Sequence, residues 1–371
     1  MSTLTELLRL MIAKEASDLH ITTGSPPRLR IAGRLLPIAK SSPLSHEDTE
    51  TLCFSVMTAA QKRRFEENLE VDISFGIKGL SRFRANIFMQ RGSPAGAFRP
   101  IPIIVKTLEE LGLPPEIGKL ADNTHGLVLI TGPTGSGKST TLSSMIDRIN
   151  TSREAHIVTV EDPMEFMHTH KKSLINQREV DSDTSSFSAA LRRILRQDPD
   201  VVMISDLHDP ETVESALIVS EMRHLTLGAL NTGSALQTIN RLIAFFPPYK
   251  QDQARTLLAS VLEGIVSQRL VPSSSGKGKV AAVELLIPSP GVRGLISENR
   301  LQQVYSMMQS ADASPGLRSM NNSLLELYTK GLITEDTAVN YSPFPDEILQ
   351  MLTKSSGVKG RNAWAGKRNL T

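Results

Sequence analysis

The chain has 371 residues, enough for about two to three domains, and its 40% hydrophobic and 22% charged content is ordinary for a globular protein. A formal net charge of +2 and 4% aromatic residues argue against the basic, aromatic-rich surface of a nucleic-acid motor. The one cysteine, Cys53, excludes internal disulfides and a four-cysteine zinc site.

The first 20 residues carry acids and bases at helical spacing, which is not the pattern of a secretory signal. No apolar run reaches the ~18 residues that a membrane-spanning helix needs. We therefore expect a cytoplasmic protein without a membrane span.

The first hundred residues or so predict a small α+β domain. Apolar side chains at helical spacing indicate an amphipathic helix over 3–14, and two short strands follow with a turn at Ala32-Gly33. A helical segment is expected over about 46–69. Apolar and polar residues then alternate over 71–77 and 83–89, which predicts a strand meander.

From His125 onward the pattern changes to nearly continuous apolar strands separated by helices. The predicted strands are "GLVLITG", "HIVTVED", "VVMISD" and "HLTLGALN". This alternation predicts an α/β fold with a parallel sheet covered on both faces. A Gly/Ser loop at 273–279 precedes one more strand and helices up to about Lys354. We thus expect domains at 1–104 and 105–354, with a disordered tail at 355–371.

The segment "GPTGSGKST" matches the phosphate-binding pattern G-x-x-x-x-G-K-[ST] and lies between a predicted strand and a predicted helix. Its glycines let backbone N–H groups converge on phosphates at a helix N-terminus. Lys138 is expected to reach the β- and γ-phosphates of ATP, and Ser139 to ligate Mg²⁺. The predicted nucleotide-binding residues are Gly132, Pro133, Thr134, Gly135, Ser136, Gly137, Lys138, Ser139 and Thr140.

Acidic residues follow two of the other predicted strands. Glu161, Asp162 and Glu165 come after "HIVTV", and Asp206 comes after "VVMIS". Acids at the carboxyl ends of such strands face the ligand crevice, so we expect them to act on water, with Asp206 also able to hold Mg²⁺ through water. His224, which begins the next strand, is either a phosphate sensor or a buried, hydrogen-bonded histidine.

Several further motifs occur in a fixed order with the phosphate loop: "VEDPMEF", "NQREV", "ALRRILRQDPDV", "TVESAL" and "IVSQRL". With the N-terminal "SDLHITTGSPPRLRIAGRLLPI", they resemble the type IV pilus retraction ATPases, the PilT family of the secretion ATPase superfamily. The resemblance implies a PAS-like N-terminal domain, a RecA-like ATPase domain and a homo-hexameric ring at the cytoplasmic side of the inner-membrane pilus base. It also implies that ATP turnover moves the domains against an inner-membrane platform protein and so drives pilin disassembly.

In that family, arginines of the N-terminal domain approach the nucleotide. The matching positions are Arg82, Arg84, Arg91 and Arg99. Guanidinium groups suit phosphate oxygens, which makes this assignment chemically reasonable.

The chain also departs from the family pattern. Asp206 replaces the usual catalytic glutamate, Asn231 replaces the usual histidine, and "GVRGLI" with Gly294 stands where "AIRNLI" is usual. These changes leave two alternatives open. The chain is a full retraction motor, or it is an ATP-binding, hydrolysis-impaired subunit that regulates or accompanies a related retraction ATPase.

Overall fold

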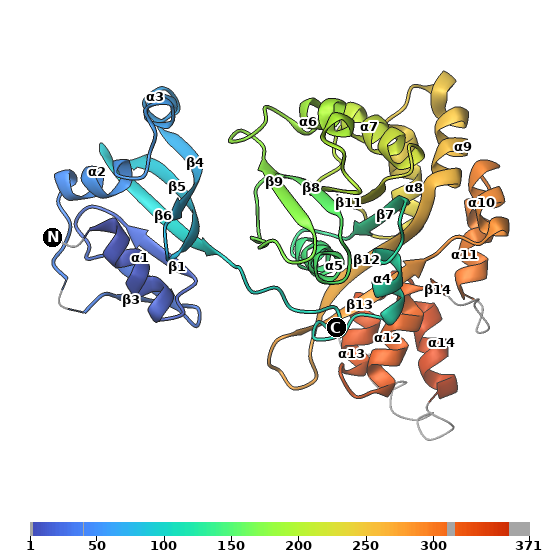
Figure 1. The fold of residues 1–371 in the computed structure, drawn as a ribbon. Coiled ribbons are helices and arrows are strands. Elements are labelled where there is room, and N and C mark those ends of the chain that lie inside the picture. Colours follow the sequence, from blue (N-terminus) through green and yellow to red (C-terminus); the bar gives the residue numbers. More distant parts are fainter. Residues whose placement is uncertain (1–2, 40, 310–315, 356–371) are drawn as a thin grey trace. The chain divides into compact units, whose positions relative to one another are not determined.

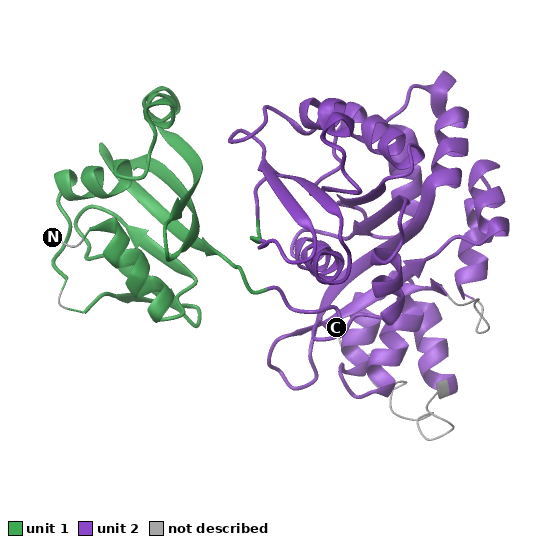
Figure 2. Cartoon of the chain, viewed as in Figure 1, with its two compact units in different colours: residues 1–104, 165–167 green, residues 105–164, 168–371 purple. Residues whose placement is uncertain are grey.

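The computed structural model describes residues 3–39, 41–309 and 316–355, and the chain divides into two compact units (Figure 2). Unit 1 comprises residues 1–104 and 165–167, and unit 2 comprises residues 105–164 and 168–371. The predicted disordered tail lies outside the described residues from position 356 onward. No helix within the described ranges is both long and apolar enough to cross a bilayer.

Unit 1 is an antiparallel six-stranded sheet in the order β3-β2-β1-β6-β5-β4 (Figure 1). Alternate strand residues such as Phe83, Ala85 and Ile87 are buried against the three helices and form one core with them. The elements are α1 (Leu4–Ala13), β1 (Asp18–Ile21), β2 (Arg28–Ile31), β3 (Arg34–Pro37), α2 (His46–Phe54), α3 (Ala59–Asn68), β4 (Glu70–Ile77), β5 (Ser81–Gln90) and β6 (Ser93–Ile101).

The helical segment expected over about 46–69 is in fact two helices, α2 and α3. Thr58 ends the continuity because its extended backbone and side chain form a capping box with Gln61 at the start of α3. The Thr-x-x-Gln spacing in the sequence indicates this break. The helical periodicity of the segment alone does not indicate it.

Unit 2 contains a mixed sheet of eight strands in the order β14-β13-β12-β7-β11-β10-β8-β9. The six strands from β12 to β9 are parallel, and β13 and β14 are antiparallel additions. The strands are β7 (Gly126–Thr131), β8 (His156–Glu161), β9 (Leu174–Glu179), β10 (Val201–Ile204), β11 (Leu225–Leu230), β12 (Leu262–Pro272), β13 (Lys279–Leu286) and β14 (Leu317–Arg318).

Helices cover both faces of this sheet (Figure 1). Leu127 and Leu129 of β7 face a core shared with α6, α7, α8 and α9, whereas Val128 and Ile130 face α4 and α5. The α/β class predicted from the apolar strands is therefore confirmed. The helices are α4 (Pro115–Ala121), α5 (Lys138–Ser152), α6 (Phe187–Ile194), α7 (Pro210–Glu221), α8 (Ala235–Ala244), α9 (Gln251–Val261), α10 (Pro290–Ser297) and α11 (Leu301–Gln309).

Three C-terminal helices form a separate small core on β12 and β13. Val271 and Ala282 of these strands pack with Met320, Leu324 and other apolar residues of the helices. The helices are α12 (Met320–Thr329), α13 (Glu335–Tyr341) and α14 (Pro345–Ser355).

Candidate functional site

The phosphate loop joins β7 to α5 at the carboxyl edge of the parallel sheet (Figure 1). Gly132, Gly135 and Gly137 have φ angles of 147°, 78° and 93°, which side-chain-bearing residues rarely adopt. At Gly132 a Cβ would lie 2.4 Å from both the Gln268 carbonyl oxygen and Ser136 Oγ. Glycine is therefore required there by space as well as by backbone conformation.

Lys138, the first residue of α5, folds back over this loop. Its Nζ donates hydrogen bonds to the Gly132 carbonyl at 2.8 Å, the Pro133 carbonyl at 3.2 Å and Asn231 Oδ1 at 2.7 Å. The ammonium group is thus held at the entrance of the loop, where an anionic phosphate would replace neutral acceptors. The contact with Asn231 also brings the end of β11 to the loop, as the sheet order requires.

A set of buried polar side chains supports the loop from beneath. Thr131 Oγ1 and Ser267 Oγ lie 2.7 Å apart, and Gln268 Nε2 donates to Thr141 Oγ1 at 2.9 Å. Ser136 Oγ is buried without a hydrogen-bond partner among the described residues, so it is available to a ligand. Ser267 and Gln268 of β12 were not predicted as part of the site. The motif "IVSQRL" contains both residues and was the sequence feature that could have indicated them.

The acids after β8 and β10 come together because these strands are neighbours in the sheet. Glu161 is 5% exposed, and its Oε1 accepts hydrogen bonds from Thr159 Oγ1 at 2.7 Å and Gln177 Nε2 at 3.0 Å. The Asp162 N–H donates to Ser205 Oγ at 3.0 Å, next to Asp206. Glu161 is thus fixed and buried, whereas Asp162 is exposed.

The carboxyl group of Asp206 interacts electrostatically with Lys138 of the phosphate loop. Burial raises the pKa of its carboxyl group, while the charges of His208 and Lys138 oppose that shift and the charge of Asp162 adds to it. His208 Nδ1 lies 3.4 Å from Asp206 Oδ2. The carboxylate therefore lies among Lys138, Asp162 and His208, at the edge where a triphosphate and its water would be.

The structure does not bring His224 to the phosphate loop. Its carbonyl accepts from the N–H of Gly126, the first residue of β7, whereas the phosphate loop follows the last. A six-residue strand at ~3.3 Å per residue puts it roughly 20 Å away. The ring's Nδ1 lies 2.7 Å from the Pro199 carbonyl oxygen, which supports the other alternative, a hydrogen-bonded structural histidine.

Glu165 and the four predicted arginines belong to unit 1. Glu165 is exposed, and residues 165–167 belong to unit 1 although the residues on either side of them belong to unit 2. Arg82 and Arg84 lie on β5, Arg91 lies in the β5–β6 turn with φ 50°, and Arg99 lies on β6 opposite Arg84. Arg99 makes an ion pair with Asp18, with 2.7 Å between Nη2 and Oδ1.

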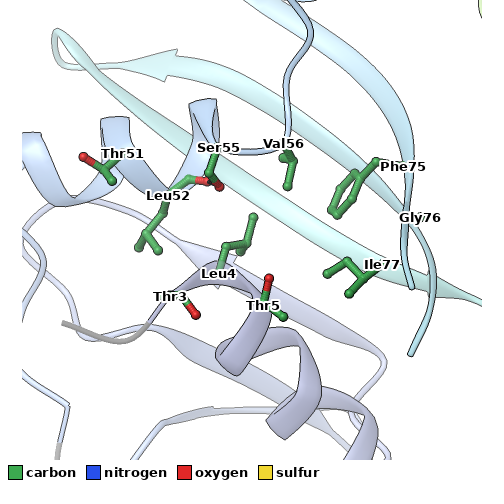
Figure 3. Close-up of a pocket in the computed structure, with 10 residues that line it drawn as sticks. All are labelled: Thr3, Leu4, Thr5, Thr51, Leu52, Ser55, Val56, Phe75, Gly76 and Ile77. Atoms are coloured by element: carbon green, nitrogen blue, oxygen red, sulfur yellow. Dashed lines mark hydrogen bonds between the residues drawn. The ribbon is translucent and has the colours of Figure 1, made fainter. Parts of the chain in front are cut away.

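A pocket of about 550 Å³ also lies in unit 1, between α1, α2 and β4 (Figure 3). Its lining is apolar, with residues such as Leu4 and Phe75, and hydroxyl-bearing, with residues such as Thr51 and Ser55. None of the described residues that line it is charged, so they supply none of the cations that a triphosphate needs.

The residues around the phosphate loop fit Mg²⁺ held mainly by phosphate and water. No group of three or more His, Cys, Asp or Glu side chains among the described residues forms a metal centre of its own. Mg²⁺ commonly takes one or two protein ligands and keeps several waters, which suits a site with the Ser139 hydroxyl and Asp206 nearby.

The chain is similar to known proteins over almost its whole length. Residues 2–327 match the family model described as Type II/IV secretion system protein. A type IV pilus retraction ATPase, PilT of Pseudomonas aeruginosa, is 42% identical over 93% of this chain and 99% of its own length. A twitching motility protein of Neisseria gonorrhoeae is 44% identical over 84% of this chain and 83% of its own. The crystal structure of the pilus retraction motor PilT with bound ADP matches with a TM-score of 0.89 at 47% identity, covering 95% of this chain and all of that one.

Proposed function

Because this chain belongs to the Type II/IV secretion system protein family, we propose that it is an ATP-hydrolysing motor that drives type IV pilus retraction. One observation carries the proposal: Lys138 is held at a glycine loop whose buried Ser136 hydroxyl is unpartnered among the described residues, with acids from β8 and β10 beside it. The relative with bound ADP and the pilus retraction relatives support it.

The geometry supports the following division of labour. The loop's N–H groups and Lys138 bind the phosphates, and Ser139 and Asp206, through water, hold Mg²⁺, which neutralises phosphate charge when bound. Asp206 orients the attacking water, with Asp162 on the same sheet edge. Glu161 keeps this edge ordered through its hydrogen bonds to Thr159 and Gln177.

The larger assembly is part of the same proposal. Six copies form a ring at the cytoplasmic face of the inner-membrane pilus base and act on a platform protein. Arg82, Arg84, Arg91 and Arg99 of unit 1, together with Glu165, approach the nucleotide during the cycle. Arg99 must then exchange Asp18 for phosphate, because the two side chains are paired in this structure.

A second candidate function is an ATP-binding, slowly hydrolysing partner of a related retraction ATPase. Asp206 favours it, because an aspartate reaches ~1.5 Å less far than the family's glutamate and His208 lies close to its carboxylate. A misplacement of ~1 Å at a catalytic site can cost about a hundredfold in rate.

Steady-state ATP hydrolysis by the purified full-length chain separates the two candidates. A motor turns over within the general enzyme range of ~1–10³ s⁻¹, and Asp206→Glu does not raise its rate. For the impaired subunit, the wild-type rate lies far below that range and Asp206→Glu raises it strongly. An Asp206→Asn variant that hydrolyses ATP at the wild-type rate would remove Asp206 from the mechanism in both cases.

A further inference from the structure

Glu284 of β13 is a buried carboxylate to which the mechanism above gives no role. It is 3% exposed, and its Oε1 accepts the Ala235 N–H at 2.6 Å. The backbone N–H of Met320 also acts on this carboxylate and favours its ionised form. Ala235 is the first residue of α8 and Met320 is the first residue of α12, so one carboxylate lies at the N-termini of two helices from different parts of unit 2.

The neighbouring caps explain why these two N–H groups need Glu284. Ser234 and Ser319 are the N-cap residues, and their hydroxyls accept from the third residue of each helix, Gln237 and Asn322. The first N–H of each helix remains without a partner inside its own helix. An ionised carboxylate has two acceptor oxygens and complements the positive end of both helix dipoles.

One of the two helices continues directly from the nucleotide site. Asn231, whose Oδ1 accepts from Lys138 Nζ, lies four residues before Ala235 in the segment that joins β11 to α8. A phosphate that draws Lys138 away from Asn231 therefore changes the contacts of the segment that ends at Glu284.

The other helix, α12, is the first of the three helices that form the C-terminal core, α12, α13 and α14. Arg269 of β12 contacts these C-terminal helices, because its Nη1 donates to the Tyr341 carbonyl at the end of α13. The charges of Arg269 and Glu284 attract one another. Glu284, bonded to Ala235 and attracted by Arg269, thus lies between the 231–235 segment and the C-terminal helices.

Holding an ion in this position has an energetic cost. Burial raises the pKa of the Glu284 carboxyl group, although the two backbone N–H groups and Arg269 oppose that shift. An apolar side chain would fill the same core volume, but it would leave the Ala235 N–H without its hydrogen-bond acceptor.

We propose that Glu284 is a positioning residue that couples the nucleotide-contacting segment 231–235 to the C-terminal helices α12–α14. The inference rests on the proposed function, because it takes ATP as the ligand that moves Lys138. It assigns the C-terminal helices the role of responding to the nucleotide, although they form a core of their own.

Hydrogen–deuterium exchange of the full chain, with and without ATP and Mg²⁺, tests this coupling. In the wild type, ATP is expected to change exchange in both 231–235 and 320–329. In Glu284→Gln, which loses the charge and one acceptor oxygen, 231–235 still responds, whereas the response of 320–329 is lost. ATP affinity of this variant stays within a few-fold of the wild type, because none of the described interactions of Glu284 is with the phosphate loop.

Glu326→Gln is the matched control. Glu326 lies on α12 itself and pairs with Arg318 and Lys330, with no contact to α8 among its described interactions. This variant should keep both responses. If 320–329 still responds in Glu284→Gln, the coupling role is overturned.

The wild type alone can also overturn the inference, even if Glu284→Gln fails to fold. A wild-type chain in which 231–235 responds to ATP while 320–329 does not would refute the coupling and leave the proposed function intact. A chain in which neither segment responds and no ATP is bound would refute both.

Discussion

Gly132 shows how a missing side chain shapes the phosphate site. A Cβ there would lie 2.4 Å from Gln268 O and from Ser136 Oγ, neither of which is the end of a long flexible side chain. We predict that Gly132→Ala abolishes measurable ATP binding, because the loop must shift to relieve both contacts. Titration with a fluorescent ATP analogue measures the loss.

Gly135→Ala is the comparison that separates space from backbone conformation. Gly135 also has a positive φ, 78°, but nothing lies within 4 Å of a Cβ built on it. Its substitution carries only the left-handed backbone cost of about 1–2 kcal/mol. Equal ATP affinities for the two variants would show that the close contacts at Gly132 do not matter.

His168 makes the stability of unit 2 depend on pH. Its side chain is 1% exposed and burial lowers its pKa to about 4, below the ordinary 6.5. The folded state therefore favours the neutral ring, so the full stability is present above pH 6.5 and is lost as pH falls toward 4. Between pH 7.5 and pH 5 the loss is about 2 kcal/mol of unfolding free energy.

Urea unfolding of the wild type and of His168→Leu at these two pH values measures that loss. The variant lacks the titrating ring and should lose about 2 kcal/mol less than the wild type. His125→Leu, which removes an exposed histidine, is the control and should follow the wild type. Identical pH dependence in His168→Leu and the wild type would contradict the assignment.

Helix α10 carries a glycine that its packing does not require. Gly294 lies inside the helix, and a Cβ built on it meets nothing within 4 Å. We predict that Gly294→Ala raises the free energy of unfolding by up to ~1 kcal/mol, because alanine loses less backbone entropy in a helix. Thermal unfolding of the full chain detects this change.

Gly264 on β12 is the opposite case. A Cβ there would lie 2.7 Å from the Leu120 side chain of α4, so Gly264→Ala should lower stability. If Gly294→Ala destabilises the chain as Gly264→Ala does, then α10 depends on its glycine for a reason other than space.

At this scale the sequence predicted the central strands and the phosphate loop well, because buried parallel strands are continuous apolar runs. It missed β9, whose residues "LINQRE" are mostly polar because the strand lies at the sheet edge. It also merged α2 with α3. The roles of Ser267, Gln268 and Glu284 were not predictable, because they depend on which strands are neighbours.

The same reasoning accounts for the predicted acids and histidine. Asp162, Ser205 and Asp206 meet because each follows a parallel strand, a rule that sequence alone can apply. His224 precedes its strand rather than following it, so the same rule puts it on the opposite sheet edge. The position of a residue before or after its strand therefore distinguishes His224 from the acids of the site.

At the scale of the whole molecule, unit 2 contains the phosphate loop and its acids, and unit 1 contains the arginines. Each unit has a hydrophobic core of its own. The proposed motor uses that division. Its chemistry begins with Lys138, which holds the loop carbonyls and Asn231 in this structure.

Phosphate release from ATP by the full-length chain, compared with Lys138→Ala, tests the motor most directly. The account predicts hydrolysis by the wild type within ~1–10³ s⁻¹ and a fall of at least about a hundredfold in the variant, since a preorganised cation is lost from the phosphates. A wild-type rate no higher than that of Lys138→Ala would contradict it.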